Sequence, residues 1–158
     1  LVGLAYLFLV ICPVIFVFLN IPSFFMNPVV YGLAFVPYFV LSMSIFYISM
    51  GARKYAPRQM FHAQALTFLT LPVFMKSTIF SLLGIRGTFG ITTKGGGSKR
   101  ISYFRLWPQI LLWGLNLSAM TWAVNRFYYD RSAAVIINIV WITYHFLLLS
   151  YMFYYDEE

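Results

Sequence analysis

Residues 85–100 form the segment best suited to chemistry, because glycines, hydroxyls and cations alternate along it. The segment holds five of the chain's ten glycines and four basic side chains, Arg86, Lys94, Lys99 and Arg100. Backbone N–H groups, threonine hydroxyls and nearby cations together suit an anion, and phosphate in particular. The Gly-x-x-x-x-Gly-Lys-Ser/Thr spacing of a Walker loop is absent. The alternative interpretation is a cytoplasmic connector whose charges set the topology or contact anionic lipid.

The carboxylates are too few and too late in the chain for the usual catalytic sites. The four acidic residues are Asp130, Asp156, Glu157 and Glu158. Residues 1–129 therefore cannot assemble paired-carboxylate acid–base chemistry, a carboxylate-bound metal or an Asp-supported triad. The histidines, His62 and His145, are not spaced like a zinc site. We expect no metal, no cofactor and no complete active site within this chain.

The composition indicates lipid as the solvent for the elements that position the basic segment. The chain is 61% hydrophobic and 9% charged, whereas soluble domains are about 45–50% apolar and about 25% charged. A domain of about 150 residues buries only ~70% of the surface of its unfolded chain. A soluble enzyme, a disordered tail and a secreted disulfide scaffold are therefore excluded.

Four apolar runs are long enough to cross a hydrocarbon core of ~30 Å, so the predicted fold is an all-α membrane protein. These runs are 1–19, 29–50, 106–125 and 132–153. We expect two transmembrane helices in 1–50, a cytoplasmic interfacial helix in 51–84, a glycine-rich loop in 85–105, and two transmembrane helices with a short acidic tail in 106–158.

The apolar segment 59–84 is predicted to lie along the interface rather than to span the membrane. Pro72, Lys76 and His62 interrupt it, and nine of the eleven Lys and Arg residues lie within 51–105. If the segment crossed the bilayer, basic stretches would face opposite compartments, which the positive-inside bias disfavours. An interfacial helix keeps the whole basic stretch cytoplasmic, with Lys76 extending to the headgroups.

The predicted topology is that of a multi-pass plasma (inner) membrane protein with both ends in the cytoplasm. Only Arg126 and Arg131 then lie outside, with Asp130 as a partial counter-charge. The chain begins with Leu1 inside an apolar run and has no charged region before it. This start indicates a fragment of a longer protein rather than a signal peptide.

Two motifs resemble those of bacterial cellulose synthase catalytic subunits, which are processive, inverting family 2 glycosyltransferases. Residues 89–94, Phe-Gly-Ile-Thr-Thr-Lys, resemble the gating-loop signature Phe-x-Val-Thr-x-Lys, with Ile91 in place of valine. The motif follows the expected interfacial helix and precedes the last two spans, as in that family. Asn138, Trp141 and Tyr144 are similar to an Asn-x-x-Trp-x-x-Tyr pattern of the final span.

The resemblance implies a gating loop that inserts into the catalytic pocket when UDP-glucose is bound. Phe89 and Ile91 would pack near the uridine, and Thr92 and Lys94 would approach the diphosphate. A cation and a hydroxyl there would offset the charge that develops on the leaving UDP. The glycine run, Gly95, Gly96 and Gly97, would act as the hinge of the loop.

The resemblance also implies partners beyond this chain. The family's Asp-x-Asp, Thr-Glu-Asp and Gln-x-x-Arg-Trp motifs are absent from the sequence, so this chain alone is not expected to be active. An upstream catalytic domain would supply them, together with a divalent metal, Mg or Mn. The expected partners are the UDP-sugar, the growing polysaccharide, the bilayer and a translocation subunit, but no nucleic acid.

Aromatic and amide side chains of the last two spans are candidates for a polymer channel, since aromatic rings stack against pyranose faces. These candidates are Trp113, Trp122, Asn138, Trp141 and Tyr144. Helix packing is the alternative for each, and Asn116, Asn138 and His145 are expected to face the bundle interior rather than lipid. Two other functions stay open: a synthase of another polymer, such as hyaluronan, chitin or a mixed-linkage glucan, and a non-enzymatic membrane subunit with a basic docking loop.

Overall fold

The computed structural model describes residues 2–22, 27–85 and 103–154. Within these ranges it contains helices and no strand, which confirms the all-α prediction. The elements are α1 (Val2–Leu19), α2 (Pro28–Ala52), α3 (Pro57–Leu69), α4 (Leu71–Leu82), the short 3-10 helix η1 (Tyr103–Leu106), α5 (Trp107–Tyr129) and α6 (Ala133–Tyr154). The gating-loop motif and its glycine hinge lie outside the described residues.

Proline and side-chain caps set the beginnings of α2 and α3. Pro28 and Pro57 begin these helices, where the missing N–H costs nothing. The Asn27 side chain accepts a hydrogen bond of 2.9 Å from the Val29 backbone N–H. The Gln59 side chain accepts one of 2.9 Å from the Ala56 backbone N–H, as the second half of a capping box does. These local signals separate α2 from the helices on either side of it.

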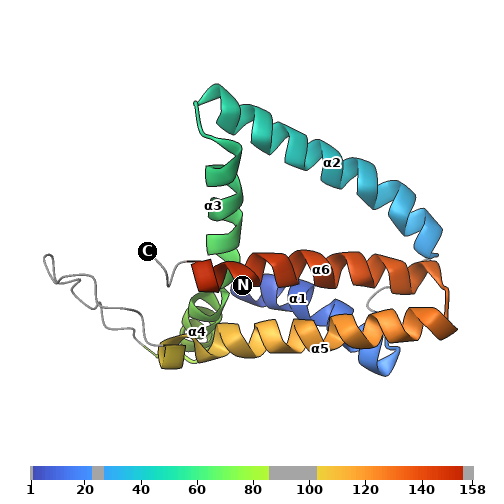
Figure 1. The fold of residues 1–158 in the computed structure, drawn as a ribbon. Helices are drawn as coiled ribbons and strands as arrows, with labels where there is room; N and C mark the ends of the chain where they lie inside the picture. The colour runs from blue at the N-terminus through green and yellow to red at the C-terminus, as the bar shows by residue number, and fades with distance from the viewer. Residues whose placement is uncertain (1, 23–26, 86–102, 155–158) are drawn as a thin grey trace, which may run out of the picture.

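Helices α1, α5 and α6 lie side by side and form the core of the molecule (Figure 1). One buried cluster joins Val10 of α1 to Leu112 of α5 and Leu148 of α6. A second cluster, further along the bundle, joins Val17, Ala119 and Ile142. The polar side chains Asn116 and His145 are also buried, with exposures of 0% and 1%. Both therefore face the bundle interior, as the sequence predicts.

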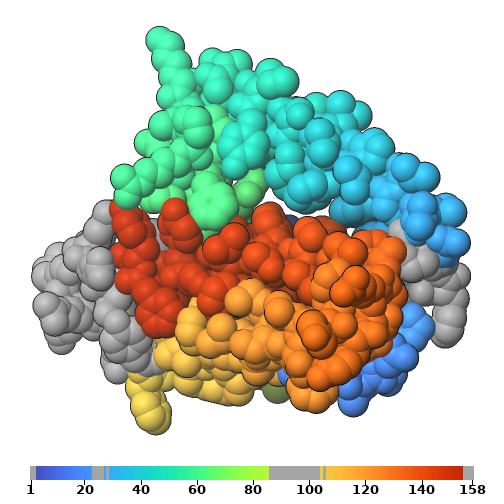
Figure 2. Space-filling view, turned by 45° about the vertical axis from the view of Figure 1, so that its right-hand side comes forward, coloured from blue at the N-terminus to red at the C-terminus, as the bar shows by residue number. Residues whose placement is uncertain are grey.

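Helix α2 leans away from this bundle (Figure 1), and aromatic rings join the two. Phe35 and Phe39 pack against Trp141 at centroid distances of 5.3 and 6.0 Å. Many other apolar side chains of α2 are exposed, Leu33 and Ile48 among them at 74% and 72%. Figure 2 shows the surface hollowed between α2 and α6. A helix that is apolar on all sides and so little covered by protein suits a lipid environment.

The segment predicted as one interfacial helix is two helices, because the chain breaks at Thr70. Helices α3 and α4 meet there at an angle of 41°. Pro72 has no N–H for the α-helical hydrogen bond, and the Val73 N–H bonds to the Thr70 carbonyl instead. The carbonyl of Leu69 is then free to accept a hydrogen bond of 2.9 Å from the side chain of Gln109. This hydrogen bond joins the break between α3 and α4 to α5.

Helix α3 crosses the bundle end where α5 begins and α6 ends, at a steep angle to both (Figure 1). It buries Met60, Ala65 and Phe68 there. At the outer side of this crossing, Arg58 Nη2 donates a hydrogen bond of 2.7 Å to the Tyr154 hydroxyl. The pair α3–α4 therefore lies across the bundle instead of running along it.

Two helices among the described residues are long and apolar enough to cross a membrane, Val29–Ala52 and Ala133–Tyr154. The bent pair α3–α4 counts as a third candidate if it is taken as one span. Gly3–Leu19 is apolar but shorter, and α5 carries Asn116, Asn125 and Arg126 among its 23 residues. Length and composition thus support two or three spans, and the count of four stays a prediction.

Candidate functional site

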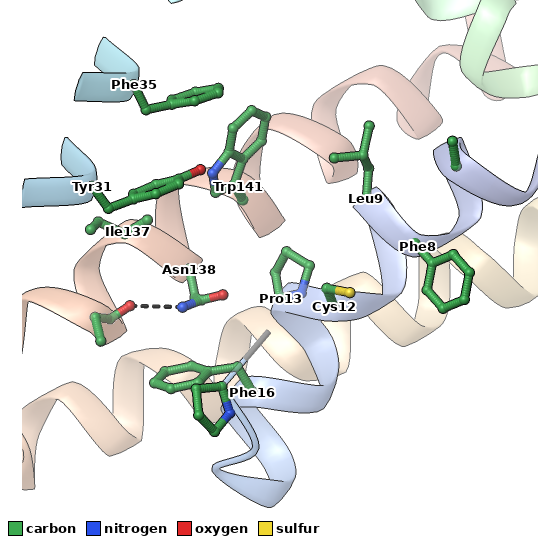
Figure 3. A pocket seen from close by; sticks show the side chains of 13 residues that line it. Phe8, Leu9, Cys12, Pro13, Phe16, Tyr31, Phe35, Ile137, Asn138 and Trp141 are labelled. Atoms are coloured by element: carbon green, nitrogen blue, oxygen red, sulfur yellow. Dashed lines mark hydrogen bonds between the residues drawn. The ribbon is translucent and has the colours of Figure 1, made fainter. Parts of the chain in front are cut away.

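A cavity with a volume of about 770 Å³ lies between α1, α2 and α6 (Figure 3). It is open on one side and lined mainly by apolar and aromatic side chains. These are Ala5, Phe8, Leu9, Cys12, Pro13, Phe16, Pro22, Tyr31, Phe35, Ala134, Ile137, Asn138 and Trp141. The cavity exists because α2 diverges from the bundle while its first half still contacts α6.

Trp141 forms an aromatic wall of the cavity together with two rings of α2. Tyr31 and Phe35, one helical turn apart, stack with centroids 5.3 Å apart and an interplanar angle of 4°. The Trp141 ring meets Phe35 at 60°, and His145 stacks behind Trp141 at 5.7 Å. His145 thus packs against the indole, as the sequence favours.

Asn138 supplies a polar group one turn before Trp141 on α6. Its Nδ2 donates a hydrogen bond of 2.8 Å to the Ala134 carbonyl, and this back-bond fixes the amide. Figure 3 shows the side-chain oxygen directed across the cavity toward Pro13. A hydroxyl donor in the cavity would find this oxygen as an acceptor.

Tyr144 lies beside the cavity and does not line it. Its ring contacts Phe39 at 6.3 Å and Trp141 at 6.0 Å, both edge to face. The Asn-x-x-Trp-x-x-Tyr spacing therefore brings its three residues to one region of α6, with Asn138 and Trp141 at the surface of the cavity and Tyr144 supporting Trp141.

The other two channel candidates lie elsewhere. Trp113 Nε1 donates a hydrogen bond of 2.9 Å to Ser150 Oγ, and its ring stacks on Phe146 at 5.3 Å. These contacts join α5 to α6. Trp122 is 51% exposed and rests against Phe18, near the ends of α1 and α5. Neither indole reaches the cavity, so their assignment to the same channel surface is not supported by position.

The remaining predicted site residues are those expected to bind the nucleotide sugar and to form the hinge of the loop. Phe89, Ile91, Thr92 and Lys94 and the hinge glycines Gly95–Gly97 all lie outside the described residues. Within the described part of the chain, no group of three or more His, Cys, Asp or Glu side chains comes together as a metal site.

Sequence reasoning missed the contribution of α1 and α2 to the cavity. The rings of Tyr31, Phe35 and Phe39 recur every four residues and so share one helix face. That spacing was a usable signal for an aromatic surface. Cys12 and Pro13, in contrast, carry no signal, because only the packing of α1 against α6 turns them toward the cavity.

Comparisons of this chain with family models, with curated proteins and with solved structures give no match. The likeness to cellulose synthases therefore rests on the residues of the two motifs, and the geometry of the site has to be judged by its own chemistry.

Proposed function

We propose that this chain is the membrane part of a processive family 2 glycosyltransferase that polymerises a β-glucan from UDP-glucose and passes it across the bilayer. In this proposal the catalytic carboxylates and their Mg or Mn ion belong to a domain outside this chain. The segment Phe89–Lys94 acts as the gating loop over the UDP-sugar, and Lys94 contacts the diphosphate.

The observation that carries the proposal is the composition of the cavity. Its aromatic wall, Tyr31, Phe35 and Trp141, offers flat ring faces, and Asn138 offers a fixed acceptor beside them. A pyranose has C–H-rich faces that stack on aromatic rings and a rim of hydroxyls that need polar partners. Binding sites for such molecules are mostly apolar with a few placed polar groups.

The placement of α3 and α4 agrees with the proposed topology. If α1, α5 and α6 stand along the membrane normal, α3 lies near the membrane plane at one end of them (Figure 1). The described basic residues Arg53, Lys54, Arg58 and Lys76 belong to this end or to the turn leading into it. In the proposal, this end is cytoplasmic and the loop that follows α4 faces the catalytic domain.

Cys12 provides the test, because it is the chain's single cysteine and it lines the cavity. In the protein reconstituted in nanodiscs, cellohexaose at saturation is expected to slow modification of Cys12 by a small methanethiosulfonate reagent. Phe35→Ala should raise the cellohexaose concentration needed for half-maximal protection by about tenfold, because a stacked ring is lost.

Phe46→Ala is the matched control, since Phe46 is also on α2 but does not line the cavity. Circular dichroism verifies that both variants keep their helix content. A glucan cavity would be excluded if the two variants needed the same cellohexaose concentration for half-maximal protection of Cys12. It would also be excluded if a fatty acid protected Cys12 and cellohexaose did not, and that result would favour a lipid-binding membrane subunit.

A further inference from the structure

A second, smaller groove lies where α1 and α5 end. It has a volume of about 420 Å³ and is lined by Val17, Phe18, Trp122, Asn125, Arg126, Tyr129 and Asp130. Both helices run toward the same end of the bundle, the end opposite α3 and α4 (Figure 1). Nothing in the larger cavity uses these side chains.

The groove combines aromatic faces with hydrogen-bonding groups on one face of α5. Trp122, Asn125, Arg126 and Tyr129 follow each other at spacings of three, one and three residues, which places them along one side of the helix. The Trp122 ring rests on Phe18 at 6.4 Å and is 51% exposed. It therefore presents a supported, accessible face to the groove.

Arg126 is held in place by bonds that use much of its hydrogen-bonding capacity. Its Nη1 donates to the carbonyls of Phe16 and Val17 at 3.0 and 3.1 Å. Its Nη2 donates to Asn20 Oδ1 at 2.6 Å and lies 3.6 Å from Asp130 Oδ2. The guanidinium is thus held in place at the groove, and the Asp130 carboxylate offsets its charge.

This charge balance decides the kind of ligand. An anion would gain little from a cation that is already paired, and it would approach the half-exposed carboxylate of Asp130. A neutral molecule with several hydroxyls can donate to Asp130 and to the Asn125 side-chain oxygen without that penalty. The accessible face of Trp122 adds stacking for a ring with C–H faces.

We propose that this groove binds a neutral saccharide, with a sugar ring stacked on Trp122 and its hydroxyls bonded to Asn125 and Asp130. In naming the emerging polymer as the natural ligand, the inference rests on the proposed function. The groove is adjacent to the cavity: the Phe16 ring lines the cavity and also lies 5.1 Å from the Arg126 guanidinium. A chain that leaves the cavity would meet this groove at the end of α1.

Calorimetry on the chain in neutral-lipid nanodiscs tests the inference, with cellohexaose as the probe. Trp122→Ala and Asn125→Ala are each expected to weaken binding by about tenfold, and Trp122→Phe should retain part of the affinity. Trp107→Ala is the matched control, because Trp107 is also an exposed indole, at 61% against 51% for Trp122, and lies at the other end of α5. A hyaluronan hexasaccharide, which is anionic, should bind more weakly than cellohexaose.

Protection of Cys12, measured in the same samples, separates this inference from the proposed function. If cellohexaose protects Cys12 but Trp122→Ala binds like Trp107→Ala, the groove is not a saccharide site and the cavity proposal stands. If Trp122→Ala loses affinity while Cys12 is never protected, the groove stands and the cavity proposal fails. Equal losses of cellohexaose affinity in Trp122→Ala and Trp107→Ala would identify both indoles as interface anchors and overturn the inference.

Discussion

Arg126 closes the end of α1 with hydrogen bonds that the helix cannot make itself. The last carbonyls of a helix lack helical partners. In α1 the Val17 carbonyl accepts from this guanidinium, and the Phe16 carbonyl accepts from it in addition to the Asn20 backbone N–H. Asn20 leaves the helix through left-handed backbone, with φ of 57°, a conformation that asparagine tolerates better than most residues. Its side chain then accepts from the same guanidinium. One side chain of α5 thus fixes where α1 stops.

Arg126→Ala should therefore destabilise the protein by about 1.5–3 kcal/mol, the range for hydrogen bonds to charged groups. Arg126→Lys should recover only part of this loss, because a single ammonium cannot reach the same acceptors in the fork geometry of arginine. Unfolding in detergent micelles by increasing SDS, followed by circular dichroism, gives the measurement. Arg131→Ala, which removes an exposed arginine of the same turn, should change stability little, and an equal loss there would assign the effect to net charge.

At the residue scale, the sequence predicted the polar side chains better than the aromatic ones. Asn116 and His145 could be placed inside because an unpaired polar group in lipid is costly. Asn138 and Trp141 were found through their spacing, which one helix preserves whatever surrounds it. Trp113 and Trp122 do not line the cavity that Asn138 and Trp141 line, because the face a tryptophan uses depends on the packing angle of α5 against α1 and α6.

At the element scale, hydropathy and proline placed four of the helices within a few residues, but the break at Thr70 was not predicted. The sequence shows Pro72 near the middle of an apolar run, and many membrane helices contain an internal proline. Pro13 and Pro37 indeed lie inside continuous helices. The difference at Pro72 is tertiary: Gln109, from a distant part of the chain, takes up the carbonyl that the break releases.

Two glycines with opposite surroundings provide a prediction for helix packing. A Cβ added to Gly3 would lie 2.7 Å from the carbonyl carbon of Phe74, so α1 and α4 touch backbone to backbone there. Gly3→Ala should force the two helices apart and destabilise the protein by about 1–3 kcal/mol. A Cβ at Gly114 meets nothing within 4 Å, so Gly114→Ala should stabilise by about 1 kcal/mol through helix propensity alone.

The two substitutions are chemically identical, and SDS unfolding of both variants compares them directly. The changes in the free energy of unfolding are expected to have opposite signs. A stabilising effect at both positions would mean that α1 and α4 do not approach each other this closely.

At the scale of the whole molecule, charge is divided between the two ends of the bundle. Arg53, Lys54, Arg58 and Lys76 belong to the turn before α3 and to the helices α3 and α4, whereas Arg126 and Arg131 lie at the opposite end, with Asp130 paired to Arg126. Cytoplasmic segments of membrane proteins carry the excess of lysine and arginine. In the proposed topology these four described cations place the α3–α4 end in the cytoplasm, and the groove beside Trp122 would then face outward.

This orientation predicts that both ends of the α3–α4 pair are reached from one side of the membrane. Tyr55 and Leu83 flank the pair and are 52% and 67% exposed, so Tyr55→Cys and Leu83→Cys, made in a Cys12→Ser background, are suitable reporters. Both should resist a membrane-impermeant maleimide added to intact cells and react in inverted vesicles, while Arg131→Cys should do the reverse. If Leu83→Cys reacts in intact cells while Tyr55→Cys does not, α3 and α4 form one bent span. The chain between α4 and η1, with Lys94, would then face away from the side on which a UDP-sugar is found, and the proposed gating role would be excluded.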